Sequence, residues 1–227
     1  MTSSNTLRVI SITAGVLLLG GCSAVRSGAE AGGEAASTAP KQSTISQSAS
    51  ADEEKARKQL AELVVAPDGS MDGYDRDRFP HWSNQGNSCN TREVVLQRDG
   101  TDVKVDEKCR PISGSWTSPY DGETWTDPAD LDIDHVVPLA EAWRSGAALW
   151  TDEEREQFAN DLDGVNLLAV TDNVNQAKGD KAPEDWKPPL ESYWCTYAIH
   201  WIDVKHTWEL TVEEDEVAAL EEMLDRC

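Results

Sequence analysis

Three short segments carry polar residues at the ends of apolar stretches, and their order restricts the fold of this chain more than any other feature. Residues 132–138 read DIDHVVP, residues 166–171 read NLLAVT, and residues 175–178 read NQAK. The first two segments predict short strands, and Thr171 is placed to cap a helix that carries the third. An acid–histidine pair and two Asn residues in this arrangement are able to hold one divalent metal ion and one general base.

The order of these residues resembles that of HNH nucleases. It is most similar to the secreted actinobacterial branch with a DUF1524, or GmrSD C-terminal-like, HNH domain, and the similarity is tightest over residues 131–186. The resemblance implies that His135 is the general base and that Asp134 and Asn175 bind the metal. It also implies that Asn166 braces the loop holding the base. The segment between His135 and Asn166 is longer than in compact members, which leaves the shape of the substrate groove open.

The chemistry of phosphodiester hydrolysis explains why these residue types are needed. The reaction requires an attacking water, a base that accepts its proton and a cation that offsets charge on the phosphate. Mg²⁺ prefers oxygen ligands and keeps several waters, so a carboxylate from Asp134 and an amide oxygen from Asn175 suffice. Mn²⁺ or another divalent metal is an alternative. Successive side chains of a strand point in opposite directions, so Asp134 can face the metal while His135 faces the water.

Further residues are candidates for substrate contact. Lys178 follows Asn175 on the same predicted helix face, where it is expected to contact phosphate unless it is only a cation at the helix end. Arg92 and Arg110 lie beside two cysteines and are either phosphate contacts or members of structural ion pairs. Asp132 either orients the site from behind or faces solvent.

The N-terminus predicts export. Arg8 precedes an apolar run over residues 9–19 that is too short to span a bilayer and has the length of a signal-peptide core. The run ends at Leu-Gly-Gly-Cys22, which resembles a bacterial lipobox, so residues 1–21 are a predicted signal peptide and Cys22 is predicted to be lipidated. An ordinary secretory signal is the alternative. The protein is expected outside the cytoplasm, lipid-anchored to the outer face of the cell membrane or secreted.

Composition predicts the domain boundaries. Residues 22–50 are rich in Ser, Ala, Gly, Thr and Gln and are predicted to form a disordered linker. They cannot bury enough apolar surface to offset the entropy cost of ordering. Residues 51–227 are long enough for one domain with a core, whose ββα-metal centre is expected at about residues 131–179.

Of the five cysteines, four remain for pairing if Cys22 carries lipid. An even number outside the cytosol predicts disulfides. Three pairings exist, and we favour Cys89–Cys109 with Cys195–Cys227 because each pair brackets one local unit. A zinc site is disfavoured, since the sequence has no CxxC motif and its histidines do not cluster beside the cysteines.

Hydrophobic periodicity and turn residues predict the remaining elements. Helices are expected over residues 52–65, 90–97, 138–145, 152–161 and 190–205. A capping box at residues 151–154 precedes the fourth of these, and a second at residues 211–214 precedes a last helix. Strands are expected over residues 101–105, 112–116, 131–133 and 166–170. Residues 74–82 mix aromatic and charged side chains without a period and predict a packed loop. The fold class is therefore α+β, an HNH ββα-metal core with surrounding helices and disulfide staples.

The net charge of −22 argues against tight nucleic-acid binding, because non-specific affinity comes mainly from Lys and Arg. The acidic residues concentrate on predicted helix faces, however, and residues 175–187 are balanced in charge. The nine Trp residues are either stacking platforms for bases or core residues. With only two Phe in the chain, the core is the better interpretation.

We therefore predict a monomeric, metal-dependent endonuclease that acts on nucleic acid, DNA before RNA, with no protein partner evident. One alternative is a non-catalytic extracellular binding module that keeps the ββα shape, which the net charge favours. Another is a hydrolase of a different phosphodiester. A Ser-His-Asp hydrolase is disfavoured, because the sequence has no Gly-x-Ser-x-Gly motif.

Overall fold

The computed structural model describes residues 42–227, with side chains from residue 51 onward. The predicted signal peptide, Cys22 and residues 22–41 of the predicted linker lie outside the described residues. Helix α1 (Gln42–Glu62) begins inside the predicted linker, well before residue 52, where its pattern predicts a start. Among the helices of residues 42–227, none has the length and apolar character needed to cross a membrane.

Helices and short strands are interspersed along the rest of the chain. The further helices are α2 (Thr91–Asp99), α3 (Leu139–Arg144), α4 (Asp152–Ala159), α5 (Asp172–Lys178), α6 (Trp194–Thr207) and α7 (Glu214–Leu224). The strands are β1 (Asn84–Gly86), β2 (Cys89–Asn90), β3 (Thr101–Val105), β4 (Pro111–Thr117), β5 (Thr124–Trp125), β6 (Leu131–His135) and β7 (Leu167–Thr171). They form three antiparallel sheets, β1–β2, β3–β4–β5 and β6–β7. The predicted mixture of helices and sheets is confirmed.

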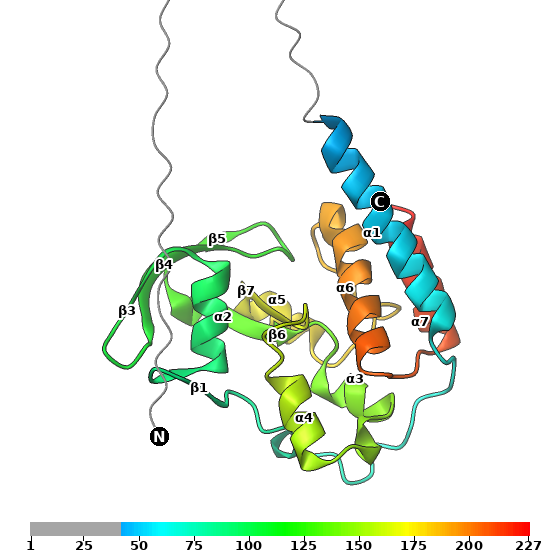
Figure 1. The fold of residues 1–227 in the computed structure, drawn as a ribbon, viewed down its shortest axis with the longest axis horizontal. Helices are drawn as coiled ribbons and strands as arrows, with labels where there is room; N and C mark the ends of the chain where they lie inside the picture. The colour runs from blue at the N-terminus through cyan, green and yellow to red at the C-terminus, as the bar shows by residue number, and fades with distance from the viewer. Residues whose placement is uncertain (1–41) are drawn as a thin grey trace, which may run out of the picture. The chain divides into compact units, whose positions relative to one another are not determined.

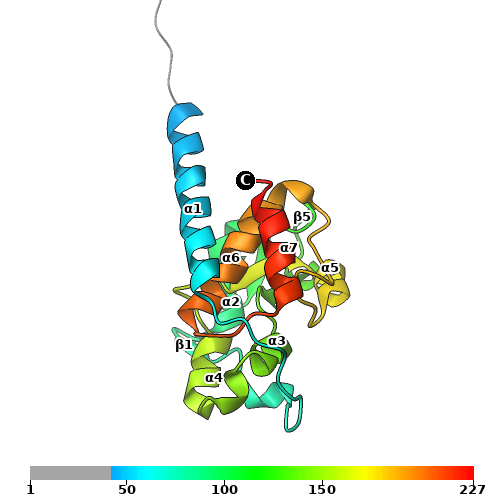
Figure 2. The same cartoon turned by 90° about the vertical axis from the view of Figure 1, so that its right-hand side faces the viewer.

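One side of the molecule is helical, with α1, α6 and α7 packed side by side (Figures 1 and 2). Helix α6 turns Tyr197, Trp201 and Val204 into the core, as its three- and four-residue spacing predicts. A disulfide between Cys195 and Cys227 links the start of α6 to the residue that ends the chain after α7. This second predicted pairing is therefore confirmed.

Two of the three predicted helix caps differ from expectation. The capping box at Thr151 and Glu154 of α4 is present. Helix α7 instead begins at Glu214, with its box formed by Glu213 and Glu216, so the predicted box at residues 211–214 is wrong. The third, Thr171, precedes α5 but makes no capping bond. Its hydroxyl accepts a hydrogen bond from the Trp125 indole at 2.8 Å.

The sheet side of the molecule has its own apolar cluster. Helix α2 contributes Val95 and Leu96, β4 contributes Trp116, and the β6–β7 hairpin contributes Ile133 and Leu167. A larger cluster fills the helical side. Every Trp belongs to one of the two clusters or packs against it, namely residues 82, 116 and 125 on the sheet side and 143, 150, 186, 194, 201 and 208 on the helical side. The prediction that the Trp residues form the core is confirmed for Trp116, Trp143 and Trp201, which are buried, while the other six are partly buried.

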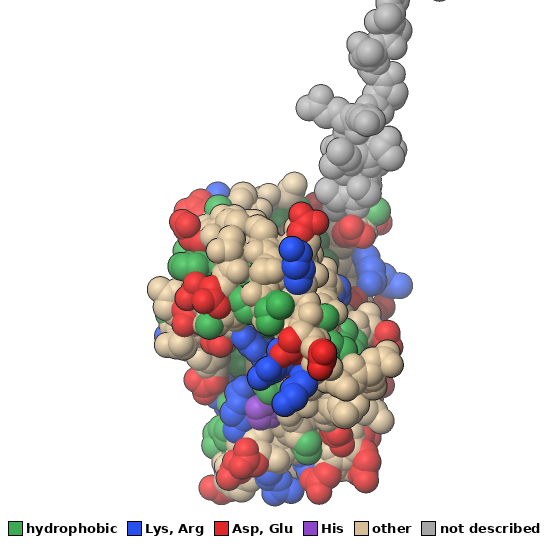
Figure 3. Space-filling model, turned by 90° about the vertical axis from the view of Figure 1, so that its left-hand side faces the viewer, with side chains coloured by type: hydrophobic (Ala, Val, Ile, Leu, Met, Phe, Trp, Pro, Cys, Tyr) green, Lys and Arg blue, Asp and Glu red, His purple; other side chains and the backbone are tan. Residues whose placement is uncertain are grey.

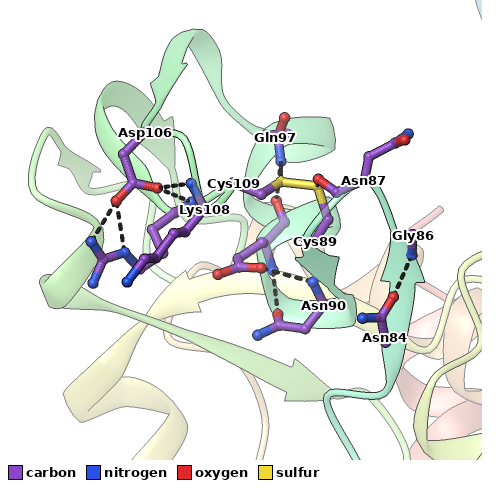
Figure 4. The surroundings of a disulfide bond; sticks show 11 residues. Asn84, Gly86, Asn87, Cys89, Asn90, Gln97, Asp106, Lys108 and Cys109 are labelled. Carbon is purple, nitrogen blue, oxygen red and sulfur yellow. Dashed lines mark hydrogen bonds and ion pairs between the residues drawn. A yellow bond between two sulfur atoms is a disulfide. The ribbon is translucent and has the colours of Figure 1, made fainter.

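The first predicted disulfide, Cys89–Cys109, is also confirmed, and Figure 4 shows its surroundings. It ties the strand before α2 to the turn between β3 and β4. A capping box formed by Asn90 and Glu93 begins α2 directly after Cys89. Helix α2 is thereby fixed against one face of the β6–β7 hairpin. Helix α5, which follows β7 directly in the sequence, also packs on both strands.

Candidate active site

The β6–β7 hairpin sorts the predicted site residues by strand alternation. Its register pairs Leu131 with Thr171 and His135 with Leu167. Leu131 and Ile133 belong to the apolar cluster shared with α2. Alternate residues of a strand share one face, so Asp132 and Asp134 point the other way, and both bond to residues of α5.

Asp134 is almost completely buried and bonded on several sides. The ammonium Nζ of Lys178 lies 2.9 Å from its Oδ1 and 2.7 Å from its Oδ2. The Tyr120 hydroxyl donates to Oδ2. Burial raises the pKa of Asp134, and the charge of Lys178 opposes that shift. Since Lys178 also donates to the carbonyl oxygen of His135 at 2.7 Å, one side chain holds both residues of the acid–histidine pair.

Asn175 is half-buried on α5 and is oriented by the other strand carboxylate. Its Nδ2 donates to Oδ2 of Asp132 at 3.1 Å. Amide nitrogen and oxygen have opposite bonding roles, so this bond fixes which end of the amide is free. Asp132 thus orients Asn175, which is the first of the two roles expected for it.

His135 lies in a buried aromatic slot. Its ring stacks between Trp82 and Phe158, with centroid distances of 5.9 and 6.4 Å. Nε2 is 3.0 Å from the carbonyl oxygen of Ala159. A carbonyl only accepts, so Nε2 carries the hydrogen and Nδ1 keeps its lone pair. Burial lowers the pKa of His135 to about 3 despite this hydrogen bond, so the ring is neutral at neutral pH.

Asn166 fixes the backbone that follows His135. Its Oδ1 accepts from the Val137 amide at 3.0 Å, and its carbonyl oxygen accepts from the Val136 amide at 2.7 Å. The side chain is fully buried, and its Nδ2 has no hydrogen-bond partner among the described residues. This contact pattern matches the bracing position implied for Asn166.

A cavity of about 290 Å³ brings the predicted residues together. Asp134, His135 and Asn175 all border it, as does Arg76 from the loop before β1. The three predicted residues come from two elements that are far apart in sequence, β6 and α5. Their convergence on one cavity is what water activation and cation binding at a single phosphate require.

The predicted phosphate contact of Lys178 is wrong. Its side chain is fully buried, and its three short contacts go to Asp134 and the His135 carbonyl. Helix α5 is short and follows β7 directly, so its last turn lies over the hairpin. A cation at this position offsets the charge of the buried Asp134 carboxylate and is not exposed as a surface charge.

Arg92 and Arg110 have structural partners and do not border the cavity. Arg92 donates to the carbonyl oxygens of Pro128 and Leu131 at 3.1 and 2.8 Å, which anchors the start of β6. Arg110 pairs with Asp106 across an exposed turn, with Nε at 2.7 Å from Oδ2. A phosphate contact by either residue stays a prediction.

Two residues of the site were missed in the sequence. Tyr120 bonds to Asp134 from a turn whose Ser-Pro-Tyr-Asp-Gly pattern indicates only a change of direction. Arg76 borders the cavity from a segment without any period. The only signal for Arg76 was the unusual mixture of aromatic and charged residues over 74–82.

The donor set fits a hard divalent ion. Among the residues with described side chains, no three His, Cys, Asp or Glu cluster closely enough to hold a metal. Mg²⁺ does not need such a cluster, because it takes one or two protein oxygens and completes its shell with water. The Asp134 carboxylate and the Asn175 amide border the same cavity. An ion there would share Asp134 with the ammonium of Lys178.

The family model for the C-terminal domain of GmrSD restriction endonucleases matches residues 91–223, and the chain belongs to this family. The resemblance derived from the motif is thereby confirmed, and the family gives the chain a nuclease-related character. A protein of Arthroderma benhamiae, described as an uncharacterized secreted protein, is 61% identical over 168 residues. These cover 74% of this chain and 82% of the relative. No solved structure matches the chain.

Proposed function

We propose that this chain is an extracytoplasmic, metal-dependent endonuclease that hydrolyses phosphodiester bonds in nucleic acid, with DNA as the first substrate to test. Membership of the GmrSD C-terminal family supports the reaction class. The observation that carries the proposal is that His135, Asp134 and Asn175 border one cavity. In this proposal, the β6–β7 hairpin and α5 form the ββα core.

In this proposal Nδ1 of His135 accepts the proton of the attacking water, while Nε2–H stays on the carbonyl oxygen of Ala159. That hydrogen bond favours the protonated ring, and a phosphate in the cavity would add negative charge beside it. The resting pKa of His135 already includes that hydrogen bond, so the phosphate is the added effect that would raise it toward the range in which a general base works. Asn166 is a positioning residue, since it holds the backbone that follows the base.

Asp134 and Asn175 would hold the divalent ion, which when bound offsets negative charge on the phosphate and the leaving oxygen. Asp132 takes the Nδ2 end of the Asn175 amide, which leaves the oxygen end as a ligand. Lys178 and Tyr120 both stabilise the ionised form of Asp134. Each of these side chains therefore keeps an oxygen ligand in the state that a hard cation requires.

The decisive variant is His135→Gln, assayed by nicking of supercoiled plasmid with Mg²⁺ or Mn²⁺. Loss of a general base is expected to lower the rate by about 10²- to 10⁴-fold. His206→Gln is the matched control, because His206 lies on α6 and pairs with Glu62 away from the cavity. Unfolding curves of both variants check the fold. Full activity of folded His135→Gln would overturn the proposal.

A non-catalytic binding module is the competing function, and one contact favours it. Lys178 already occupies Asp134 with an ion pair at 2.7 Å, and the net charge of −22 disfavours polyphosphate binding. Isothermal titration with Mg²⁺ and Mn²⁺ separates the two functions, since an absence of metal binding supports the module. A panel of phosphodiesters, including wall polymers and lipid headgroups, tests whether the substrate is something other than nucleic acid.

We also propose that the mature chain is lipid-anchored through Cys22 outside the cytoplasm. Disulfides persist in oxidising compartments, and both cysteine pairs of the described region are bonded. The Arthroderma benhamiae relative is described as secreted. The mass of the mature N-terminal peptide tests the anchor, which an unmodified Cys22 would refute.

A further inference from the structure

We infer that Arg76 binds the substrate phosphate and places it beside His135. The inference rests on the proposed nuclease function and adds to it a residue outside the matched family region, residues 91–223. Arg76 borders the same cavity as Asp134, His135 and Asn175.

The turn that carries Arg76 is held in place from both sides. Residues 76–78 form one turn of 3₁₀ helix, and the Asp75 side chain caps it by accepting from the Asp77 amide at 2.9 Å. Phe79, directly after the turn, is fully buried. Tyr74, two residues before it, packs edge-on against Trp143 at 5.8 Å. The backbone that carries Arg76 is therefore fixed between two aromatic anchors, while its exposed guanidinium makes none of the contacts that hold the turn.

The charge balance of the cavity leaves Arg76 without a local counterion. Two carboxylates border the cavity with it, and both are paired with cations other than Arg76, although Asp180 shares its partner Arg144 with Asp68 and Glu141. Asp134 is paired with Lys178 at 2.7 Å, and Asp180 is paired with Arg144 at 2.9 Å. Among the residues whose side chains are described, no carboxylate lies within ion-pair distance of Arg76. Arg76 is therefore a cation at the border of the cavity that no described carboxylate pairs with.

The chemistry of the guanidinium identifies the ligand class. Arg stays charged at any working pH and offers paired donors that match two oxygens of one phosphate. Figure 3 shows one face of the molecule on which Lys and Arg side chains gather beside a histidine, although the chain as a whole is strongly acidic. A phosphodiester is the anion that the neighbouring candidate base would act on.

Arg78 provides a control within the same turn. It is also exposed, but its guanidinium lies over the Trp143 ring at 5.3 Å and it does not border the cavity. Arg76→Gln and Arg78→Gln remove the same charge from nearly the same place. Long-range electrostatics change equally in the two variants, so a difference between them reports direct phosphate contact.

The experiment measures binding of a fluorescently labelled DNA duplex at several salt concentrations, in the His135→Gln background to prevent cleavage. Arg76→Gln is expected to weaken binding roughly 10- to 100-fold, as for a lost charged hydrogen bond. It should also flatten the dependence of log K on log salt by about 0.9, the value of one phosphate contact. Arg78→Gln should leave both values near the parent, and Arg76→Lys should restore the slope better than the affinity. Equal effects of Arg76→Gln and Arg78→Gln would overturn the inference.

A second probe separates this inference from the proposed function. Inorganic phosphate, followed by NMR shifts of the full chain, is expected to bind wild type and Arg78→Gln but not Arg76→Gln. If phosphate binds through Arg76 and the wild type cleaves no nucleic acid, the nuclease proposal fails while the anion site stands. If the wild type cleaves and Arg76→Gln binds as Arg78→Gln does, only the Arg76 inference fails. If neither duplex nor phosphate binds the wild type, both fail.

Discussion

Lys178 and Lys205 are both fully buried, one beside the candidate site and the other in the helical core. The ammonium of Lys178 has a single carboxylate partner, Asp134. The ammonium of Lys205 has two, Glu141 and Glu216, each at 2.8 Å. A backbone carbonyl completes the shell in both cases.

The second carboxylate decides which way the lysine pKa moves. Burial lowers the pKa of both ammonium groups. For Lys205, the attraction of Glu216 and Glu141 outweighs burial and raises its pKa. For Lys178, the attraction of Asp134 alone does not, and its pKa is lowered. We infer that the Lys205 cluster is a fixed structural element. The Lys178 pair has one carboxylate fewer, and its Asp134 borders the cavity in which the proposed divalent ion would compete with Lys178.

Lys205→Met should have the largest effect on stability. It leaves Glu216 buried without a cation, while Glu141 keeps only Arg144 at 2.8 Å. Removing one partner of a buried ionic cluster typically costs about 3–5 kcal/mol. Urea unfolding measured by circular dichroism tests this. A loss below about 1 kcal/mol, the range of exposed ion pairs, would contradict the assignment of a fixed core cluster.

Lys178→Met should destabilise less and should respond to metal. Burial raises the pKa of Asp134, which can take up a proton when its partner is lost, so we expect about 3 kcal/mol. A divalent ion would then occupy the freed carboxylate. At a hundredfold excess over its dissociation constant, a ligand adds about 2.7 kcal/mol to stability. Unfolding curves with and without Mg²⁺ or Mn²⁺ measure this gain.

The control for metal rescue is Lys205→Met, which should gain no more stability from the cation than the wild type does. The double variant Lys178→Met with Asp134→Asn should lose the rescue, since an amide is a weaker ligand than a carboxylate. If the cation shifts Lys178→Met and wild type by the same amount, Lys178 and the metal do not share Asp134. The comparison between the two lysines would then have no bearing on function.

The parts of this molecule that were predictable from sequence are those set by local chemistry. Strand β3 matches its predicted range of residues 101–105, and the α4 capping box lies at the predicted residues. The β6–β7 hairpin and α5 were predictable because polar residues mark the ends of their short apolar runs. Both cysteine pairs bracket local units and were therefore accessible to the same reasoning.

The residues that were misjudged depend on contacts distant in sequence. Lysine is rarely buried, so an exposed role for Lys178 was the better expectation. Its burial follows from Asp134, which lies 44 positions earlier and needs a counterion. Tyr120 and Arg76 reach the site from irregular segments. No hydrophobic period exists there to indicate direction, and only the packed structure brings them to the cavity.

Glu216→Gln should produce an effect that depends on pH. Burial raises the pKa of Glu216 to about 7, so the folded state holds a proton that the unfolded chain releases near 4.5. Stability from this group is therefore full below pH 4.5 and is lost as pH rises toward 7. The slope is at most about 1.4 kcal/mol per pH unit. Glu216→Gln should remove this component from urea midpoints measured across that range.

The comparison must be made between variant and wild type at each pH, because His135 contributes with the opposite sign. The pKa of His135 is lowered to about 3, so the unfolded chain binds the extra proton and stability rises as pH increases toward 6.5. With Glu216 replaced, its own falling component should disappear, while the rising component of His135 remains below pH 6.5. If the variant instead keeps the wild-type profile, Glu216 is ionised in the folded state. Lys205 would then hold two full negative charges, and the two buried lysines would differ even more in their balance of charge.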